Sequence, residues 1–193
     1  MRVRKIIAEK IFRTSVDKTI DRIVTFINPR DKIIDLGAGT CLLTHQLRER
    51  GYSVFPVDVK NRSYYLDIQS QIYDGKNLPF KNNEFDICLL LAVLHHTPNP
   101  EAVMQEAVRV SKKLIVSEDA VTNVFQRLYT FFIDSILNKE LIAPHSNKTD
   151  KQWRSLYKNL GLILIRTENR KSWLFLQNPL YFLKKEAESN KEK

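Results

Sequence analysis

Residues 33–40 read IIDLGAGT, a short apolar run that ends on Asp35 and Leu36 and is followed by two glycines, Gly37 and Gly39. The apolar run predicts a strand, and the residues after the glycines predict a helix. Glycines let the backbone approach a ligand without an intervening side chain, and a helix N-terminus offers free N–H groups. The stretch therefore predicts a nucleotide-like ligand at the carboxyl end of this strand, with a plain tight turn as the alternative.

The composition fits a single folded domain. The chain has 193 residues, of which 43% are hydrophobic and 27% charged, so disorder throughout is not expected. Its two cysteines, Cys41 and Cys88, lack the partner spacing of a zinc site, and no metal is expected. Since no signal peptide precedes them, a reduced, cytoplasmic location fits best. The longest apolar run, residues 87–94, is less than half of the roughly 20 residues that a membrane helix needs, so no membrane span is expected.

The charge of the chain leaves two interpretations open. A net charge of +9 would suit an anionic partner such as a nucleic acid. The positive charge is not gathered into one stripe, however, because it concentrates at the two ends, residues 1–10 and 183–193, with acidic residues mixed in. The ends are therefore either simply solvated or a patch that docks a partner. The oligomeric state is not indicated by this pattern.

Strand-like and helix-like patterns alternate along the chain, which is typical of a parallel sheet with helices on its faces. Residues 1–27 carry apolar side chains at roughly helical spacing and predict one or two amphipathic helices. Strands are predicted at residues 32–36, 53–57, 72–73, 85–91, 114–117, 162–166 and 173–176. Further helices are predicted at residues 42–50, 101–110, 123–137 and 150–160, the last ended by Gly161.

Acidic residues follow the second and third predicted strands. Asp58 ends the second strand, where a carboxylate can accept hydrogen bonds from both ribose hydroxyls. Asp74 and Gly75 follow the third strand, where an acceptor side chain and a backbone N–H can bind an adenine edge. A dinucleotide fits poorly, because its fingerprint needs a third Gly or Ala where this chain has Leu42. None of the strand ends offers a basic residue for a pyrophosphate, so the predicted ligand is adenosine that carries a cationic group.

The segment DLGAGT at residues 35–40, Asp58, and the LPF…FD…LHH…P pattern within residues 74–119 resemble the class I S-adenosylmethionine-dependent methyltransferases. The resemblance implies an α/β fold with a Rossmann-like, doubly wound sheet of seven strands, mostly parallel with an antiparallel last strand, and helices on both faces. It implies a single methyltransferase domain over residues 1–184 and a frayed tail over residues 185–193. S-adenosylmethionine is the cofactor that it implies.

The resemblance also implies a role for each residue around the methionine part of the cofactor. Asp35 would hold the methionine ammonium through a water molecule. The backbone of Gly37, Ala38 and Gly39 would line the methionine moiety. A backbone carbonyl near Leu91 would meet the ammonium from the end of the fourth strand.

The adenosine part of the cofactor is assigned in the same way. Asp58 would bind the ribose and Val59 would pack on the adenine, while Asp74 and Gly75 would bind the adenine edge. One departure from the family is Cys41, which stands where the family often has a third glycine. If Cys41 adopts the conformation of a first helical residue, its side chain can turn away and binding survives; otherwise affinity suffers.

The methyl acceptor decides whether a base is needed. A carboxylate or thiolate acceptor needs none, whereas a hydroxyl or carbon acid usually does. His95 and His96 follow the fourth strand at the ligand edge, which makes His95 a candidate catalytic residue. The alternative is that these histidines cap the helix at Pro100 or bond to loop backbone.

A second catalytic candidate follows from chain direction. Two predicted helices lie between the fifth and sixth strands, and the second must run away from the ligand edge. Its preceding loop, residues 143–149, is then at that edge, so His145 is a candidate for the substrate pocket. The alternative is that Thr149 or Asp150 simply caps the helix while the other loop residues are solvated.

Some methyl acceptors fit poorly. Exocyclic base-amine methylases place Asn or Asp, Pro, Pro and an aromatic residue directly after the fourth strand, and here Asn99 and Pro100 come too late. Carbon methylation through a cysteine adduct needs an exposed Pro-Cys, whereas Cys88 lies within a strand. Phe85 and Asp86, although part of the pattern, are assigned to packing and strand entry.

Three functions remain. The first is methyl transfer to a small-molecule acceptor, with residues 121–149 as a helical cap and residues 1–28 as a lid over the cofactor. The second is an RNA or protein methyltransferase that docks its substrate through the basic ends, which strong salt dependence would favour. The third is a non-catalytic module that binds S-adenosylmethionine without transfer.

Overall fold

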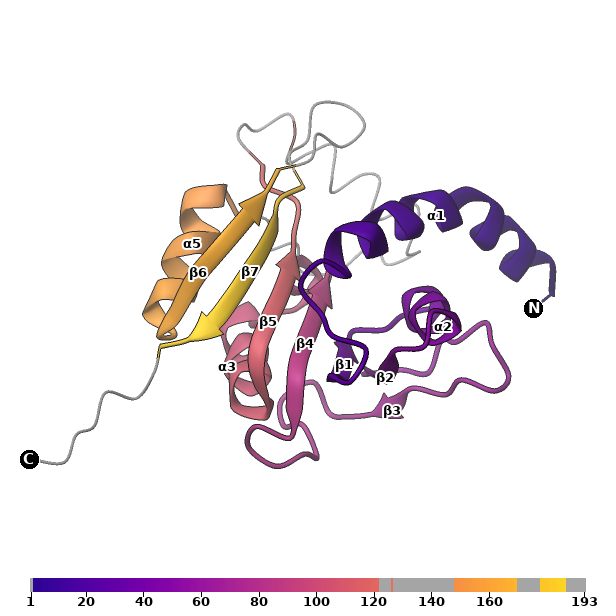
Figure 1. The fold of residues 1–193 in the computed structure, drawn as a ribbon, viewed down its shortest axis with the longest axis horizontal. Coiled ribbons are helices and arrows are strands. Elements are labelled where there is room, and N and C mark those ends of the chain that lie inside the picture. The colour runs from indigo at the N-terminus through magenta and orange to yellow at the C-terminus, as the bar shows by residue number, and fades with distance from the viewer. Residues whose placement is uncertain (1, 122–125, 127–147, 170–177, 187–193) are drawn as a thin grey trace, which may run out of the picture. The chain divides into compact units, whose positions relative to one another are not determined.

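The structure is a computed structural model, and it describes residues 2–121, 126, 148–169 and 178–186, with side chains from residue 13 onward (Figure 1). The helices are α1 (Arg2–Ile23), α2 (Leu42–Glu49), the short 3-10 helix η1 (Leu94–His96), α3 (Pro100–Val110) and α5 (Asp150–Asn159). The strands are β1 (Lys32–Leu36), β2 (Ser53–Asp58), β3 (Gln71–Ile72), β4 (Phe85–Leu91), β5 (Ser111–Ser117), β6 (Leu162–Glu168) and β7 (Leu180–Lys185). No helix in these residues is both long and apolar enough to cross a membrane.

The seven strands form one sheet in the order β3-β2-β1-β4-β5-β7-β6. β1 pairs in parallel with β2 and β4, and β2 pairs in parallel with β3. β7 is antiparallel to both of its neighbours, β5 and β6. The predicted fold class, a doubly wound α/β sheet with an antiparallel last strand, is therefore confirmed.

The chain divides into two compact units, which are described separately. Residues 1–89 and 109–112 form the first unit, and residues 90–108 and 113–193 form the second. The prediction of a single domain over residues 1–184 stays a prediction.

The first unit is built on buried parallel strands. β1 is buried from its second residue to its last, and Ile87, Cys88 and Leu89 of β4 lie beside it with at most 1% exposure. Such continuous apolar runs are typical of strands that are covered on both faces. They explain why the bounds of both strands could be predicted to the residue.

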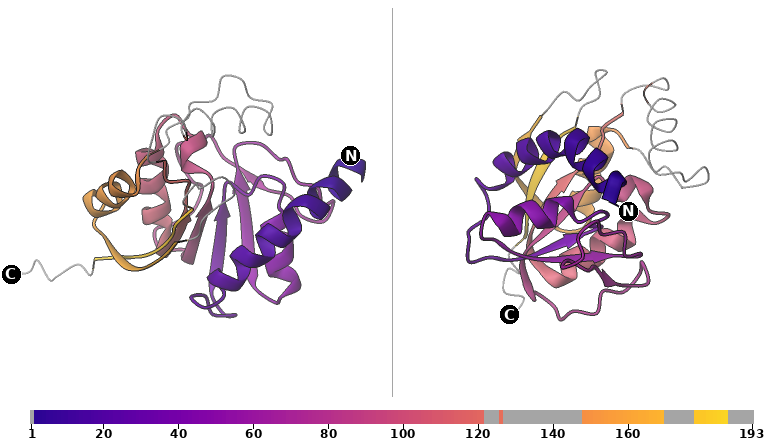
Figure 2. Two further views of the ribbon diagram at one scale, coloured as in Figure 1. Left: turned by 90° about the horizontal axis from the view of Figure 1, so that it is seen from above. Right: turned by 90° about the vertical axis from the view of Figure 1, so that its right-hand side faces the viewer.

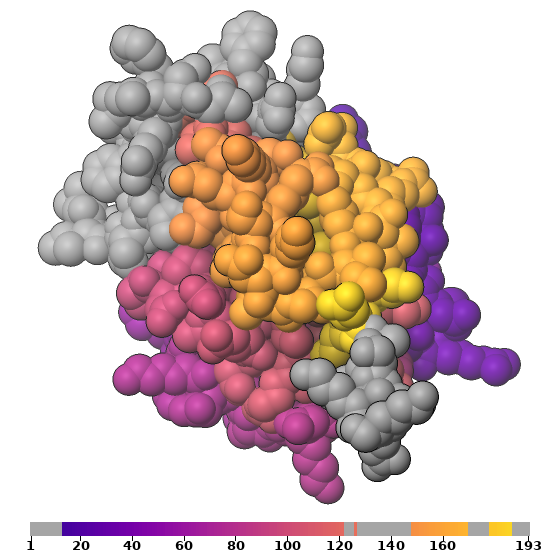
Figure 3. All heavy atoms as spheres, turned by 90° about the vertical axis from the view of Figure 1, so that its left-hand side faces the viewer, coloured from indigo at the N-terminus to yellow at the C-terminus, as the bar shows by residue number. Residues whose placement is uncertain are grey.

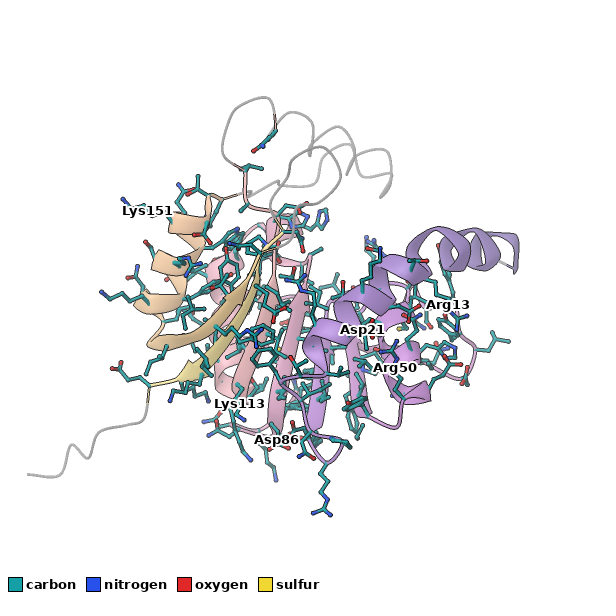
Figure 4. All side chains as sticks on the ribbon, turned by 45° about the horizontal axis from the view of Figure 1, so that its top comes forward. Arg13, Asp21, Arg50, Asp86, Lys113 and Lys151 are labelled. Carbon is teal, nitrogen blue, oxygen red and sulfur yellow. The ribbon has the colours of Figure 1, made fainter. Side chains whose placement is uncertain are left out.

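Helix α1 lies beside α2 in this unit (Figures 1 and 2). Ile20 and Ile23 of α1 are fully buried, and Arg50, directly after α2, forms ion pairs with Asp17 and Asp21 at 2.9 Å (Figure 4). The amino-terminal segment is thus one helix that packs on the unit. Its predicted action as a lid stays a prediction.

The second unit places β7 between β5 and β6, with α5 packed on this part of the sheet. Trp153 and Tyr157 of α5 are buried, and the Tyr157 ring meets that of Tyr181 on β7 edge to face at 5.1 Å. The opposite side of α5 faces solvent, where Lys151 points outward (Figures 3 and 4). The 3.6-residue period of α5 therefore separates a buried aromatic side from a charged side.

The last strand is where the sequence prediction and the structure differ. The strand predicted at residues 173–176 lies outside the described residues, and the observed seventh strand is β7. Its first four residues are all buried, and both of its edges pair with neighbouring strands. The tail predicted from residue 185 also begins too early, since Lys185 belongs to β7 and the Glu186 N–H donates to the Gly161 carbonyl at 2.9 Å.

Smaller differences concern element ends. β5 begins at Ser111 and β6 ends at Glu168, so both are longer than predicted. Gly161 follows α5 with a φ of 68°, as expected for a residue that ends a helix. The helix predicted at 123–137 and most of the predicted cap, 121–149, lie outside the described residues.

Candidate functional site

The glycine turn after β1 is fixed by the neighbouring strand. Gly37 and Gly39 have φ angles of 81° and 52°, values that glycine adopts without steric cost. The N–H groups of Gly37 and Ala38 both donate to the Val57 carbonyl, at 2.7 Å and 3.1 Å. The turn is therefore held by β2 as well as by its own chain.

Asp58, at the end of β2, completes this arrangement. Its Oδ2 accepts a hydrogen bond from the Gly39 N–H at 2.8 Å, and its Oδ1 accepts one from the Lys60 N–H at 3.2 Å. Only 9% of Asp58 is exposed. The structure thus brings together the glycine turn and the carboxylate that were predicted to share one ligand.

Asp35 lies in β1, just before the glycine turn, and is buried. It is 3% exposed, and its Oδ2 accepts a hydrogen bond from the Thr44 hydroxyl at 2.6 Å. Burial raises the pKa of Asp35 to about 6; the Thr44 hydrogen bond acts in the opposite direction, and the charge of Asp58 adds to the increase. A cation near Asp35 would favour its ionised form, so the carboxyl group suits a ligand that carries an ammonium.

The ends of β2 and β3 lie side by side. The Tyr73 N–H donates to the Asp58 carbonyl at 3.2 Å, and a Cβ built on Gly75 would lie 3.4 Å from Val59 Cγ1. Gly75 has a φ of 78°, and Val59 is 46% exposed. Val59 and Gly75 are thus adjacent, as a shared adenine site requires.

The Asp74 side chain is used within its own turn. Its Oδ1 accepts hydrogen bonds from the N–H groups of Lys76 and Asn77 at 2.8 Å and 2.7 Å. These bonds, that of Asn77 most of all, lower the pKa of Asp74. The carboxylate therefore shapes the turn, and its predicted contact with an adenine stays a prediction.

Cys41 does not adopt the conformation of a first helical residue. It is the residue that caps α2, with φ 60° and ψ 20°, in the left-handed region that favours glycine. Its side chain is fully buried with its Sγ 3.3 Å from the Ser70 hydroxyl, and it packs in a cluster with Leu42, Tyr65 and Ile68. Residue 41 therefore has a backbone conformation that favours glycine while its side chain is buried, and the predicted effect on cofactor affinity stays a prediction.

The second unit contains the other candidate, His95. This residue lies in the turn after β4 with 2% of its surface exposed, and its Nδ1 is 2.5 Å from Glu118 Oε2. Glu118 Oε1 accepts hydrogen bonds from the N–H groups of Val93 and Leu94 at 2.9 Å and 2.7 Å. His95 is therefore held from the end of β5. Leu91, the last residue of β4, precedes this turn, and its predicted cofactor contact stays a prediction.

Glu118 was missed as a site residue by the sequence analysis. The available signal was an acidic pair, Glu118 and Asp119, directly after the buried strand β5. Ligands bind at the carboxyl ends of strands in such sheets, so a carboxylate directly after β5 is a candidate site residue in the same way as Asp58 after β2. What the sequence did not show is that this carboxylate pairs with a histidine 23 residues earlier in the chain.

His145 lies outside the described residues, but the chain just after it is placed. Ala120 and Lys148 form a parallel bridge, and the Val121 N–H donates to the Lys148 carbonyl at 3.2 Å. The chain that enters α5 thus lies next to the segment that leaves β5, as the count of chain directions required. Thr149 caps α5 in a reciprocal box with Gln152, as one half of the alternative predicted, and the place of His145 in the substrate pocket stays a prediction.

Phe85 and Asp86 have the structural roles that were predicted. Phe85 is fully buried and meets the rings of Phe55 and Phe80 edge to face. Asp86 accepts hydrogen bonds from the Lys32 N–H at 2.9 Å and from the Lys112 ammonium at 2.7 Å. Within the described residues, no cluster of three His, Cys, Asp or Glu side chains could hold a metal ion.

Comparison with known proteins finds a matching family model and related sequences. Residues 34–114 match the family model of a methyltransferase domain. Over 117 residues the chain is 31% identical to a demethylmenaquinone methyltransferase of Corynebacterium urealyticum, an alignment that covers 57% of this chain and 49% of that protein. The first curated relatives are matched over about half to two thirds of their length, from 49% to 62%.

Solved structures are similar over most of the chain. One is a SAM-dependent methyltransferase of Methanosarcina mazei, with a TM-score of 0.66, 18% identity and coverage of 84% of this chain and 96% of that one. Another is the magnesium protoporphyrin IX methyltransferase of Synechocystis PCC 6803 with bound SAH, with a TM-score of 0.65, 17% identity and coverage of 90% and 82%. These similarities show that the chain has the Rossmann-like fold of methyltransferases.

Proposed function

We propose that this chain is an S-adenosylmethionine-dependent methyltransferase that acts on a small-molecule acceptor. The observation that carries the proposal is the bond between Gly39 N–H and Asp58 Oδ2, which joins the glycine turn to the acid of the next strand. The match of residues 34–114 to a methyltransferase domain supports it. The neighbouring structure with bound SAH supports the choice of cofactor.

The residues of the first unit fit such a cofactor by their chemistry. A buried carboxyl group with a raised pKa, Asp35, suits an ammonium group, and Asp58 keeps lone pairs for ribose hydroxyls beside the bonds it already accepts. The exposed Val59 beside Gly75 offers an apolar surface for a flat base. When bound, S-adenosylmethionine would supply a methyl group that is already activated for transfer.

The chain's own task is then to align the acceptor and, where needed, to remove its proton. We take His95 as the base for a hydroxyl or carbon acid, because it lies in the turn at the carboxyl end of β4 and its Nδ1 pairs with the buried Glu118. Demethylmenaquinone, named in the relatives, is the first acceptor to assay in its reduced form. An acceptor of this kind is a small molecule that would need such a base.

Calorimetry with S-adenosylmethionine and its demethylated product tests the cofactor assignment. Wild type should bind both at micromolar concentrations, and Asp58→Ala should weaken binding by about 1.5 to 3 kcal/mol through loss of charge-assisted hydrogen bonds. Asp67→Ala, which removes an exposed aspartate from the same unit, is the matched control and should bind as wild type does. Wild type that binds neither compound, or Asp58→Ala that binds like the control, would refute the assignment.

The two alternative functions make different predictions in the same experiments. Turnover of RNA or protein with a steep loss of substrate binding at high salt would favour the second function. Micromolar cofactor binding without turnover of any acceptor would favour the binding module. Turnover of a reduced quinone that barely depends on salt is the outcome expected here.

A further inference from the structure

Glu118 lies outside the cofactor residues, yet among the described residues of the second unit it is the carboxylate with the most hydrogen bonds. It is fully buried. Its two oxygens face the N–H groups of Val93, Leu94 and His95 and the Nδ1 atom of the His95 ring. A buried carboxylate that receives this many donors is fixed in position, and so is the turn that supplies them.

The turn itself needs such support. Ala92 has a φ of 57°, in the left-handed region, and its N–H donates to the Ser117 carbonyl at 2.8 Å. The chain then enters η1, whose first N–H groups have no partner within so short a helix. Glu118 Oε1 accepts hydrogen bonds from the N–H of Leu94, the first residue of η1, and from that of Val93, the residue before it. The end of β5 thus ties down the turn at consecutive positions.

The contact between Glu118 and the His95 ring bears on which ring nitrogen carries the proton. If Glu118 is ionised it can only accept, and the hydrogen on the 2.5 Å line between Glu118 Oε2 and His95 Nδ1 then comes from the ring. Nδ1 is then the protonated nitrogen of the neutral ring. Nε2 is the nitrogen that carries the lone pair and can take up a proton.

We propose that Glu118 is a positioning residue that fixes the tautomer and orientation of His95, so that Nε2 serves as the base. The base role rests on the proposed function. In the step, the acceptor's O–H or C–H bond would break and its proton would move to Nε2. The electron pair left on the acceptor would form the new bond to the methyl carbon while the methyl–sulfur bond breaks, and that bond's electron pair would return to sulfur, so that S-adenosylhomocysteine leaves. Glu118 does not touch the reacting atoms, because it bonds the opposite nitrogen of the ring.

Neighbouring groups supply a matched control. Asp119 follows Glu118 and is half-buried, but its Oδ1 accepts a hydrogen bond from the Asn178 amide at 3.1 Å. The His96 ring stacks at a tilt on the His95 ring with centroids 4.0 Å apart. Of the two acidic residues after β5, Glu118 is therefore the one bonded to the His95 ring, and Asp119→Asn should leave the tautomer unchanged.

The decisive variant is Glu118→Gln. The glutamine oxygen can still accept from the turn, whereas its NH₂ group would face Nδ1 and would need an acceptor there. If Glu118 sets the tautomer, the neutral His95 ring in Glu118→Gln should carry its proton on Nε2. If Glu118 is only an anchor for the turn, the tautomer should not change.

Long-range ¹H–¹⁵N correlation NMR of the full chain reports the tautomer without any substrate. The His95 signals are assigned as those absent from a His95→Gln variant. In wild type, above the pH at which the ring is neutral, we expect a protonated Nδ1 and an unprotonated Nε2. In Glu118→Gln the two should exchange roles, and in Asp119→Asn they should not.

A wild-type His95 with its proton on Nε2 would overturn the inference even if Glu118→Gln fails to fold. An unchanged tautomer in folded Glu118→Gln would overturn it as well. Cofactor binding is measured separately by calorimetry, so a failed tautomer test leaves the methyltransferase proposal standing. Conversely, failure to bind S-adenosylmethionine removes the base role but not the dependence of the tautomer on Glu118.

Discussion

The glycine turn of the first unit and the histidine turn of the second are built in different ways. At the glycine turn, the N–H groups of Gly37 and Ala38 bond to a backbone carbonyl of β2. At the histidine turn, one side chain from a distant strand, Glu118, receives the donors. The glycines of a turn held through its backbone are visible as a sequence motif, whereas a turn held by one buried side chain leaves no such motif in its own residues.

Removal of the Glu118 side chain should produce the largest effect of the changes considered. Glu118→Ala removes the buried carboxylate that bonds the His95 ring and the Val93 and Leu94 N–H groups, and breaking a buried pair of this kind costs about 3 to 5 kcal/mol. Urea denaturation should show this loss in the free energy of unfolding. Asp119→Ala, which loses the bond to Asn178, should cost about 1 to 2 kcal/mol. Equal losses of unfolding free energy in Glu118→Ala and Asp119→Ala would contradict the expectation that Glu118 contributes more to stability than Asp119 does.

The same contrast explains what could be predicted from the sequence. The bounds of β1 and β4, the glycine turn and Asp58 follow from continuous apolar runs and from spacing along the chain. β7 was missed, because its apolar residues run directly into the charged carboxyl-terminal segment and only its place between β5 and β6 makes it a strand. Glu118 was missed because its partner is defined by tertiary structure alone.

Asp35 provides a test of the first unit through pH. Since burial raises the pKa of Asp35 to about 6, the carboxyl group is mostly protonated at pH 5 and mostly ionised at pH 8. A ligand whose ammonium needs the ionised form should therefore bind about tenfold more tightly at pH 8 than at pH 5. Calorimetry with S-adenosylhomocysteine across this range measures the change.

Two controls separate this effect from a general effect of pH. Adenosine has no ammonium group, so its affinity should vary little over the same range. Thr44→Val removes the hydrogen bond that stabilises the charged carboxylate and should move the midpoint for S-adenosylhomocysteine to higher pH. A flat profile for S-adenosylhomocysteine, or equal profiles for the two ligands, would show that Asp35 does not bind the ammonium.

Cys41 offers a smaller test of backbone conformation. Cys41→Ala and Cys41→Gly both lose the contact between the Cys41 Sγ and the Ser70 hydroxyl, so their comparison isolates the backbone. At a φ of 60°, glycine should be more stable than alanine by about 1 kcal/mol, the reverse of the usual order. Thermal or urea unfolding of the two variants gives the difference. A more stable alanine variant would mean that residue 41 is not left-handed in solution.

The smallest expected effect concerns a tyrosine pair in the second unit. Among the described residues the Tyr157 hydroxyl is buried without a hydrogen-bond partner, while the Tyr181 hydroxyl donates to Asp150 Oδ1 at 2.7 Å. Tyr157→Phe removes a polar group that has lost its water without a replacement, so it should be neutral or stabilise the fold by up to about 1 kcal/mol. Tyr181→Phe removes a bond to a carboxylate and should destabilise the fold by about 1 to 2 kcal/mol.

The two variants differ from wild type by the same single atom and their rings pack against each other, which makes them a matched pair. Because the hydrophobic contacts are kept in both, any difference in unfolding free energy comes from the hydroxyl groups. Urea denaturation of both variants at neutral pH measures it. A loss for Tyr157→Phe as large as that for Tyr181→Phe would mean that the Tyr157 hydroxyl finds a partner in solution, such as a buried water molecule. The second unit would then contain another fixed polar contact beside the one at Glu118.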